Sequence, residues 1–172
     1  YKKIVYCSSS IVYGDQGSKL YTENMPTYAD DIYSISKLEN EEKVLTSGGV
    51  VTRFSNVIGD GMSKKNALSK ILKQLSGKDA LTIYNLKPIR DFIFIDDVVD
   101  AIFSLVLKDT SGIYNIGSGV ETSINNLIEI VLNASEQYDR EIKSTIKSFL
   151  CCIFNITIFI YKMKIFSSGF AN

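Results

Sequence analysis

A tyrosine and a lysine four residues apart, preceded by a serine cluster, are the side chains most suited to chemistry in this sequence. The serines occupy residues 8–10, and Tyr33 and Lys37 follow them. On a helix over residues 32–45, Tyr33 and Lys37 share a face. An ammonium beside a phenol favours its ionisation, and a nearby serine hydroxyl can bond both the phenol and a substrate oxygen. Such a set moves a proton on or off an alcohol or carbonyl while a cofactor moves the hydride.

The composition excludes several other classes of site. The 172 residues, 45% of them apolar, are enough for one domain with its own core. The net charge is zero and no basic patch stands out, so we expect no nucleic-acid partner. There is no histidine, which rules out Ser-His-Asp and Cys-His nucleophiles and histidine-ligated metals. The three cysteines form neither a disulfide framework nor a CxxC pair, so we predict no metal site and a reducing, cytoplasmic setting.

The two ends of the sequence differ from the remainder. The chain begins at Tyr1 without Met or a signal peptide. Residues 149–161 are apolar without helical or strand periodicity, and this run is shorter than the roughly 20 residues of a membrane span. We interpret residues 147–172 as a divergent apolar tail that contains a buried strand or residues read from a shifted frame, and we expect no membrane association. A tail anchor is the alternative interpretation of the same run.

Strands and helices alternate along the sequence. Short β-branched or apolar runs predict strands at residues 3–7, 50–54, 81–84, 91–95 and 113–116. Glycines and polar residues predict loops at residues 14–31 and 56–61. Strands that alternate with helices are typical of an α/β fold with a largely parallel sheet.

Three helices with apolar stripes are expected beside the strands. The first has Asp30 or Asp31 as its cap and an apolar stripe that excludes Tyr33 and Lys37; the stripe comprises Ile32, Ile35, Leu38, Val44 and Leu45. The second has core positions at Leu68, Ile71, Leu72 and Leu75. The third begins at Asp96 or Asp97 and carries Val98, Val99, Ala101, Ile102, Leu105 and Val106.

A fourth helix follows the last strand. A turn at residues 117–119 leads to Thr122 or Ser123 as the cap. Its apolar positions are Ile124, Leu127, Ile128 and Val131.

Several short blocks appear in one fixed order, and together they are far more specific than any one of them. They are Ser8-Ser9 with Val12-Tyr13-Gly14, Glu23 before Pro26, Tyr33 with Lys37, Arg53-Phe54-Ser55-Asn56 with Gly59, Arg90 to Asp97, and Tyr114 to Gly119. In this order they resemble the extended short-chain dehydrogenases/reductases, in the NAD-dependent epimerase/dehydratase family. The resemblance implies that residues 1–146 are a partial Rossmann-like, doubly wound parallel sheet, the C-terminal half of that domain, with part of a small substrate-binding region.

The resemblance assigns the catalytic residues and the cofactor contacts. It makes Tyr33 the acid/base and gives Lys37 the nicotinamide ribose and the activation of Tyr33. Ser9 takes the position of the catalytic serine or threonine, where it also contacts the substrate. Ser8 and Phe54 are assigned to the cofactor, NAD or NADP. The alternative for the serine cluster is capping of the strand end, which suits Ser8 and the following serine better than Ser9.

The resemblance also assigns a nucleotide-sugar site. Asn56 and Arg90 are expected to contact the diphosphate, because a planar guanidinium suits phosphate oxygens. Thr82 and Tyr84 belong to the short strand whose backbone lines the base. Each has an alternative: Asn56 is then only a turn residue, Arg90 forms a surface ion pair with Asp91, and the strand presents ordinary backbone.

The phosphate-binding part of the family pattern is missing from this sequence. The G-x-x-G-x-x-G turn is expected roughly a hundred residues before Ser9, and no such turn occurs in the chain. We therefore expect the chain alone not to bind NAD tightly, and the choice between NAD and NADP is not encoded in it. Family members pair through the helix that carries the catalytic tyrosine, so a homodimer is expected by resemblance.

Three functional interpretations follow from the resemblance. Sugar dehydratases carry Thr-Asp-Glu where this chain has Ser9-Ser10-Ile11, so dehydration is disfavoured. The first interpretation is an NAD-dependent nucleotide-sugar 4-epimerase, in which Tyr33 takes the proton of the C4 hydroxyl, the 4-keto sugar rotates, and hydride returns to its other face. The second is an NADPH-dependent 4-keto-sugar reductase with Tyr33 as acid. The third is a catalytically inactive remnant in which Tyr33 and Lys37 mark ancestry only.

Overall fold

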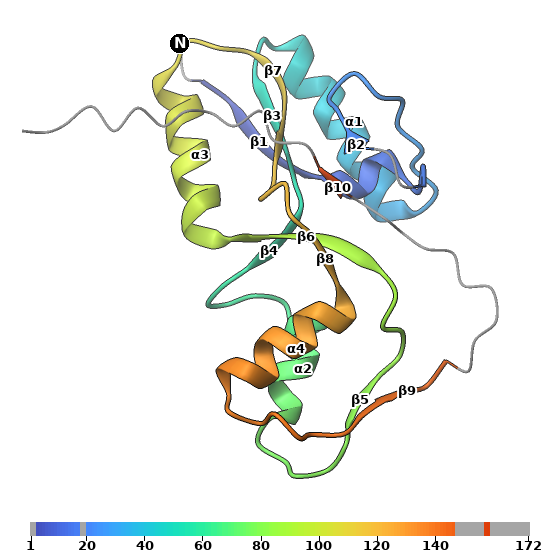
Figure 1. Ribbon diagram of the computed structural model, residues 1–172. Helices are drawn as coiled ribbons and strands as arrows, with labels where there is room; N and C mark the ends of the chain where they lie inside the picture. Colours follow the sequence, from blue (N-terminus) through green and yellow to red (C-terminus); the bar gives the residue numbers. More distant parts are fainter. Residues whose placement is uncertain (1–2, 18–19, 147–156, 159–172) are drawn as a thin grey trace, which may run out of the picture.

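The structure is a computed structural model that describes residues 3–17, 20–146 and 157–158. Helices and strands alternate along most of this range (Figure 1). In chain order the elements are β1 (Val5–Ser9), the 3-10 helix η1 (Ser10–Tyr13), β2 (Leu20–Tyr21), α1 (Ile32–Thr46), β3 (Val50–Phe54), β4 (Asn56–Ile58), α2 (Ala67–Gln74), β5 (Leu81–Ile83), β6 (Ile89–Phe94), α3 (Ile95–Leu107), β7 (Gly112–Ile116), β8 (Glu121–Ser123), α4 (Ile124–Ala134), β9 (Ile142–Ser144) and β10 (Thr157–Ile158).

The central sheet has the order β1-β3-β7, and both pairs are parallel. Its register aligns Val5 with Val50 and Val50 with Gly112. Parallel neighbours need crossover connections, which α1 supplies between β1 and β3 and which a longer segment ending in α3 supplies between β3 and β7. The predicted α/β class with a parallel sheet is confirmed.

The two helices cover opposite faces of this sheet. Successive strand residues point to opposite faces, so Val50 and Phe54 share one face and Arg53 lies on the other. Val50 and Phe54 pack in a core with Val98 of α3, whereas Arg53 is bound to Glu41 of α1. The sheet is therefore doubly wound, and α1 and α3 flank it in Figure 1.

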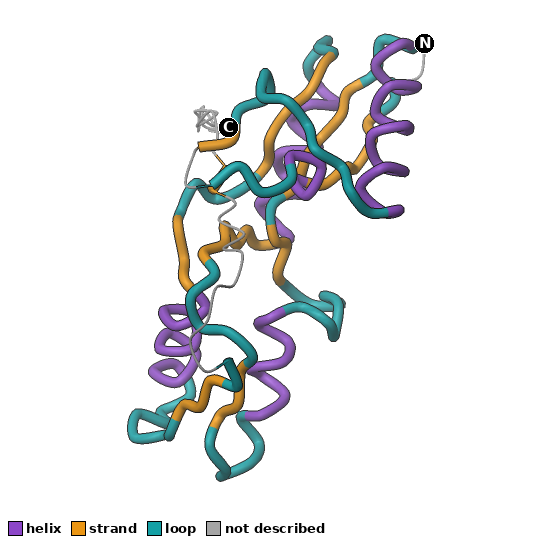
Figure 2. Tube along the Cα trace, turned by 90° about the vertical axis from the view of Figure 1, so that its right-hand side faces the viewer, coloured by secondary structure: helices purple, strands orange, loops and turns teal. Residues whose placement is uncertain are grey.

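A second group of elements lies below the sheet and carries its own core. Helices α2 and α4 pack with the parallel pair β5-β9, and Ile71, Leu81 and Ile128 are fully buried there. In Figures 1 and 2, β4, β6 and β8 run between this group and the central sheet. Strand β6 pairs with β4 in parallel and with β8 antiparallel. No helix in the described ranges is both long enough and apolar enough to cross a membrane.

Two predicted loops contain short strands. The segment 56–61 begins with β4, because its backbone extends the β6 ladder from Asn56 to Ile58. The segment 14–31 contains β2, which pairs with β10. That pairing places Thr157–Ile158 of the expected tail in a strand, while the rest of residues 147–172 lies outside the described residues.

The predicted apolar stripe of α1 is wrong at its first positions. Ile32 is 90% exposed and Ile35 is 45% exposed. The helix instead buries Ser34, which bonds to the Asp31 cap of the same helix, and Glu41, which binds Ser8 of β1 and Arg53 of β3. Its N-terminal cap is Asp31, as predicted, whose side chain accepts a hydrogen bond from the Ser34 amide while the Ser34 hydroxyl bonds back.

Two other helix predictions need correction. Ile71 of α2 is buried as expected, but Leu72 is 41% exposed because only one side of this short helix meets α4 and β5. Helix α3 begins at Ile95 without a side-chain cap, so Asp96 and Asp97 lie in its first turn, where carboxylates suit the helix dipole. Ser123 caps α4 as predicted.

A buried carboxylate explains a glycine in the turn after β7. Asp91 is fully buried, and its carboxylate accepts hydrogen bonds from Ser55 Oγ at 3.0 Å, Ser118 N at 2.8 Å and Gly119 N at 2.7 Å. A Cβ atom on Gly117 would lie 2.8 Å from a carboxylate oxygen of Asp91. The turn therefore requires a residue without a side chain at this position.

We expect Gly117→Ala to lower the free energy of unfolding by about 1–3 kcal/mol, because the methyl group displaces a carboxylate held by several donors. Gly77→Ala is the matched control, because a Cβ atom added at Gly77 would lie 3.6 Å from its nearest neighbour, the Gln74 carbonyl oxygen. Urea unfolding followed by circular dichroism measures both. Equal midpoints for the two variants would contradict the steric argument.

Candidate functional site

Tyr33 and Lys37 lie together on α1, beside the carboxyl end of β1. Lys37 Nζ donates a hydrogen bond of 2.8 Å to the Cys7 carbonyl. The same nitrogen lies 5.0 Å from the centre of the Tyr6 ring and 5.5 Å from the centre of the Tyr33 ring. Tyr33 is 54% exposed, so its phenol is open to a ligand. The structure thus brings the predicted phenol and ammonium onto one helix face.

The serine cluster divides its hydroxyls differently from the prediction. Ser9 caps η1, where its Oγ accepts a hydrogen bond of 3.4 Å from the Ile11 amide. Ser8 is 4% exposed and donates to Glu41, so its hydroxyl does not cap the strand and does not face a ligand. Phe54, also assigned to the cofactor, ends β3 opposite Ser9 and packs into the core beneath α3. Ser9 is therefore the serine whose hydroxyl remains at the strand end.

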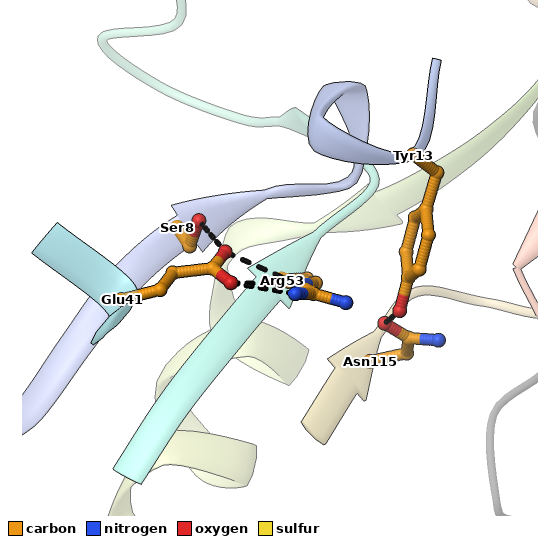
Figure 3. Close-up of polar contacts among 5 residues, drawn as sticks. All are labelled: Ser8, Tyr13, Glu41, Arg53 and Asn115. Carbon is orange, nitrogen blue, oxygen red and sulfur yellow. Dashed lines mark hydrogen bonds and ion pairs between the residues drawn. The ribbon is translucent and has the colours of Figure 1, made fainter. Parts of the chain in front are cut away.

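A buried polar network lies behind these residues (Figure 3). Arg53 binds the Glu41 carboxylate through Nη2 at 2.6 Å and through Nε at 3.1 Å. Its guanidinium carbon lies 4.7 Å from the centre of the Tyr13 ring. Tyr13 in turn donates a 2.7 Å hydrogen bond to Asn115 of β7. None of these four residues was expected to act together, because their partners are far apart in the sequence.

Burial sets the ionisation of this network. Burial raises the pKa of Tyr13 above its ordinary value, and Arg53 and Asn115 offset part of that shift. Burial alone would lower the pKa of Arg53, but the hydrogen bonds and charges of Glu41 and Tyr13 raise it overall. Arg53 therefore stays charged and Tyr13 stays neutral.

A pocket of about 740 Å³ lies between α2 and the strands β4, β5 and β6. Five residues were assigned to substrate binding, and all of them except Ser9 line this pocket: Asn56, Thr82, Tyr84 and Arg90. Asn66, Lys70, Lys73 and Gln74 of the α2 segment also line it and were not predicted. Asn66 is the cap of α2, and the sequence pattern predicted that helix only through its apolar positions.

Polar groups in the pocket have defined partners. The Gln74 carboxamide makes a pair of hydrogen bonds to the Thr82 backbone, 2.8 Å from N to Oε1 and 3.1 Å from Nε2 to O. Asn56 Nδ2 donates to the Asp91 carbonyl at 3.1 Å. The alternative of a surface Arg90–Asp91 ion pair is wrong, because the Asp91 carboxylate is buried against Ser118 and its neighbours.

Arg90 lines the pocket and is held by its own strand. Its Nη1 donates to the Ile89 carbonyl at 2.8 Å. Burial lowers the pKa of Arg90, and the nearby groups of Asp15 and Tyr21 offset part of that shift. A partly desolvated cation of this kind binds an anion more strongly than an exposed one.

The residues present fit one end of a nicotinamide cofactor. A half-exposed phenol and an ammonium lie at the carboxyl end of a strand in a parallel sheet, which is where dinucleotides bind in such folds. Tyr33 and Lys37 are the residues that would hold the ribose there. Within the described part of the chain, no group of His, Cys, Asp or Glu is placed to hold a metal ion.

The chain belongs to the NAD-dependent epimerase/dehydratase family, because the model of that family matches residues 1–117. The dTDP-L-rhamnose 4-epimerase of Burkholderia thailandensis is 32% identical over an alignment of 124 residues, which covers 64% of this chain and 33% of that protein. The dTDP-4-dehydro-6-deoxyglucose reductase of Escherichia coli is 29% identical over an alignment of 142 residues, which covers 76% of this chain and 45% of that protein. The chain thus spans less than half the length of these curated relatives.

Solved structures share the fold. UDP-glucose 4-epimerase from Thermotoga maritima, solved with UDP-glucose, aligns with a TM-score of 0.78 at 23% identity over 94% of this chain and 55% of that one. The dTDP-glucose 4,6-dehydratase from Bacillus anthracis, solved with NAD, gives a TM-score of 0.78 at 23% identity over 90% of this chain and 52% of that one. The Rossmann-like class of the sheet is therefore established.

Replacing Tyr13 tests the buried network through pH. Because folding raises its pKa above the ordinary value of 10.0, the stability it contributes is complete below that pH and is lost as the pH rises through the folded value. Tyr13→Phe leaves Asn115 without its donor and costs about 1–3 kcal/mol near neutrality. We expect the difference in free energy of unfolding between wild type and Tyr13→Phe to become smaller from about pH 9 to about pH 11.

Urea unfolding across that pH range measures the effect, with the exposed Tyr28→Phe as the control that keeps the wild-type dependence. A gap between wild type and Tyr13→Phe that is the same at both ends of the range would refute the assignment.

Proposed function

We propose that this protein is part of an NAD-dependent nucleotide-sugar 4-epimerase. The observation that carries the proposal is the combination of the Tyr33–Lys37 face with a separate pocket lined by three cations, Lys70, Lys73 and Arg90. Support also comes from relatives that act on nucleotide sugars, one of them a 4-epimerase. The expected partner is the nucleotide sugar, and a homodimer is expected from family membership.

The pocket supplies charge and shape for a nucleoside diphosphate. Three cations line it, and no carboxylate is among its lining residues, so a diphosphate is the anion that suits it. Arg90 provides a planar fork of donors, and Asn56 adds an amide from β4. Thr82 of β5 and Tyr84 directly after it offer the base a stretch of backbone, where the Gln74 carboxamide bonds the Thr82 backbone.

The α1 residues hold and move a proton at the sugar hydroxyl. Tyr33 accepts the proton of the C4 hydroxyl and returns it later, while Lys37 holds positive charge near the phenol. Ser9, at the strand end, donates to or accepts from the same oxygen. NAD, when bound, supplies the acceptor for the hydride. The chain lacks the glycine turn that binds the pyrophosphate, so we expect its own affinity for NAD to be weak.

A turnover assay separates the candidate activities. In one reaction the purified protein is given UDP-glucose with NAD, and in the other it is given a dTDP-4-keto-6-deoxy sugar with NADPH. The products of both reactions are resolved by chromatography. Epimer formation without net consumption of nicotinamide supports the 4-epimerase. Stoichiometric oxidation of NADPH supports a reductase, and no turnover with either pair rejects both activities for this polypeptide.

Tyr33→Phe is expected to lower turnover by roughly 100-fold or more, because the phenol is the group that moves the proton. Binding of the nucleotide sugar, measured by calorimetry, stays at the wild-type value. Tyr28→Phe, which alters another exposed tyrosine just before α1, is the control. Near-normal turnover by Tyr33→Phe would remove this residue from the acid/base role.

Arg90→Met is expected to weaken UDP binding by about 10- to 100-fold, which corresponds to the loss of one charge-assisted contact. Calorimetry with UDP measures the affinity without any catalytic step. Lys87→Met removes an exposed positive charge three residues away that does not line the pocket, so it serves as the matched control. Similar losses in both variants would indicate general charge attraction in place of a diphosphate site.

A further inference from the structure

Helix α1 is attached to the sheet by polar groups. It buries Ser34 and Glu41, and its apolar Ile32 and Ile35 are exposed to solvent. Neither of the two buried residues of α1 is apolar, so close apolar packing does little to fix the rotation of this helix on the sheet. Hydrogen bonds and ion pairs with short, directional contacts do fix it. The placement of Tyr33 therefore depends on the polar contacts of its helix.

These contacts lie in one row. Tyr33, Lys37 and Glu41 are separated by four residues each and share a face of α1. Lys37 donates to the Cys7 carbonyl, and Glu41 accepts from the Ser8 hydroxyl, so successive residues of β1 hold successive turns of the helix. The row thus ties the part of α1 that carries the phenol to Cys7 and Ser8 of β1.

Arg53 fixes the far end of this row. It grips Glu41 with Nε and Nη2 as a fork, and its side chain is 5% exposed against 3% for Glu41. Nη1 is buried and has no hydrogen-bond partner among the described residues, and the guanidinium lies on the Tyr13 ring (Figure 3). Tyr13 connects in turn to Asn115 of β7. One guanidinium therefore joins α1, β3, η1 and β7.

A buried ion pair of this kind contributes little net stability. Desolvation of two charges offsets most of their attraction, so replacing both by apolar side chains of similar size is often neutral, while removing one partner is strongly destabilising. What an apolar pair cannot reproduce is the fixed fork geometry. We infer that Glu41 and Arg53 are positioning residues that set the register of α1 on β1, and so fix where Tyr33 and Lys37 lie relative to that strand. The link from register to catalysis rests on the proposed function.

The test compares Glu41→Leu/Arg53→Met with wild type and with Glu42→Leu, a change at the exposed neighbouring glutamate. Thermal melting reports global stability, and hydrogen exchange by mass spectrometry reports α1 separately from α2 and α4. We expect the double variant to melt cooperatively, with a melting temperature within roughly a few degrees of the wild-type value. We also expect its α1 amides to exchange at least about tenfold faster, with α2 and α4 unchanged.

A wild-type exchange rate in α1 of the double variant overturns the inference, and so does an equal rise in all three helices, which would indicate a merely structural pair. If the double variant does not fold, the same two measurements are made on Arg53→Lys. This variant keeps the positive charge and loses the two-point contact that the guanidinium makes with Glu41. Its α1 must then exchange faster than in wild type, with α2 and α4 unchanged, for the inference to stand.

Kinetics separate this inference from the proposed function. In the turnover assay, kcat of the double variant is expected to fall at least about tenfold with KM within about twofold of wild type, because the pocket is on other elements. Selective loosening of α1 supports the positioning role whether or not the protein turns over. Loosening of α1 with normal kcat would overturn the catalytic link, whereas normal turnover in Tyr33→Phe would overturn the proposed function alone.

Discussion

The buried carboxylate of Asp91 is the interaction on which the two parts of the molecule depend. Burying a carboxylate is costly unless donors surround it, and here it receives hydrogen bonds from Ser55 Oγ, from Ser118 through both N and Oγ, and from Gly119 N. The backbone carbonyl of Asp91 also accepts a hydrogen bond from the Asn56 side chain. These donors come from the end of β3, the start of β4 and the turn after β7. The carboxylate therefore ties the parallel sheet to the strands that lead into the pocket.

This junction explains how distant residues reach one pocket. Asn56 is separated from the last residue of β3 by Ser55 alone, and Arg90 directly precedes Asp91 on β6. Because β4 and β6 pair in parallel, Asn56 lies opposite Phe92, and both Asn56 and Arg90 line the pocket. A position that looks purely structural thus determines where the two predicted anion contacts lie relative to each other.

Much of the fold was predictable from local signals, and the contacts between elements were not. The Asp31 and Ser123 caps, the parallel strands and the Tyr33–Lys37 face follow from short-range patterns that the sequence carries directly. The Glu41–Arg53 pair was not predicted, because nothing local distinguishes a buried glutamate from its exposed neighbour. The pocket lysines were missed for a similar reason: a helix pattern identifies an apolar side but does not say what the polar side faces.

The pocket and the Tyr33–Lys37 face rest on separate cores. The pocket is built on the core of Ile71, Leu81 and Ile128, whereas the sheet on which α1 lies packs through Val50 and the α3 residues beneath it. A defect in one core need not loosen the other, since each element contacts mainly its own group. Under the proposed function, binding of a nucleoside diphosphate would belong to the lower group, and proton transfer at the sugar would belong to α1 and β1. In that proposal, the strands held by Asp91 fix the position of the pocket relative to the phenol.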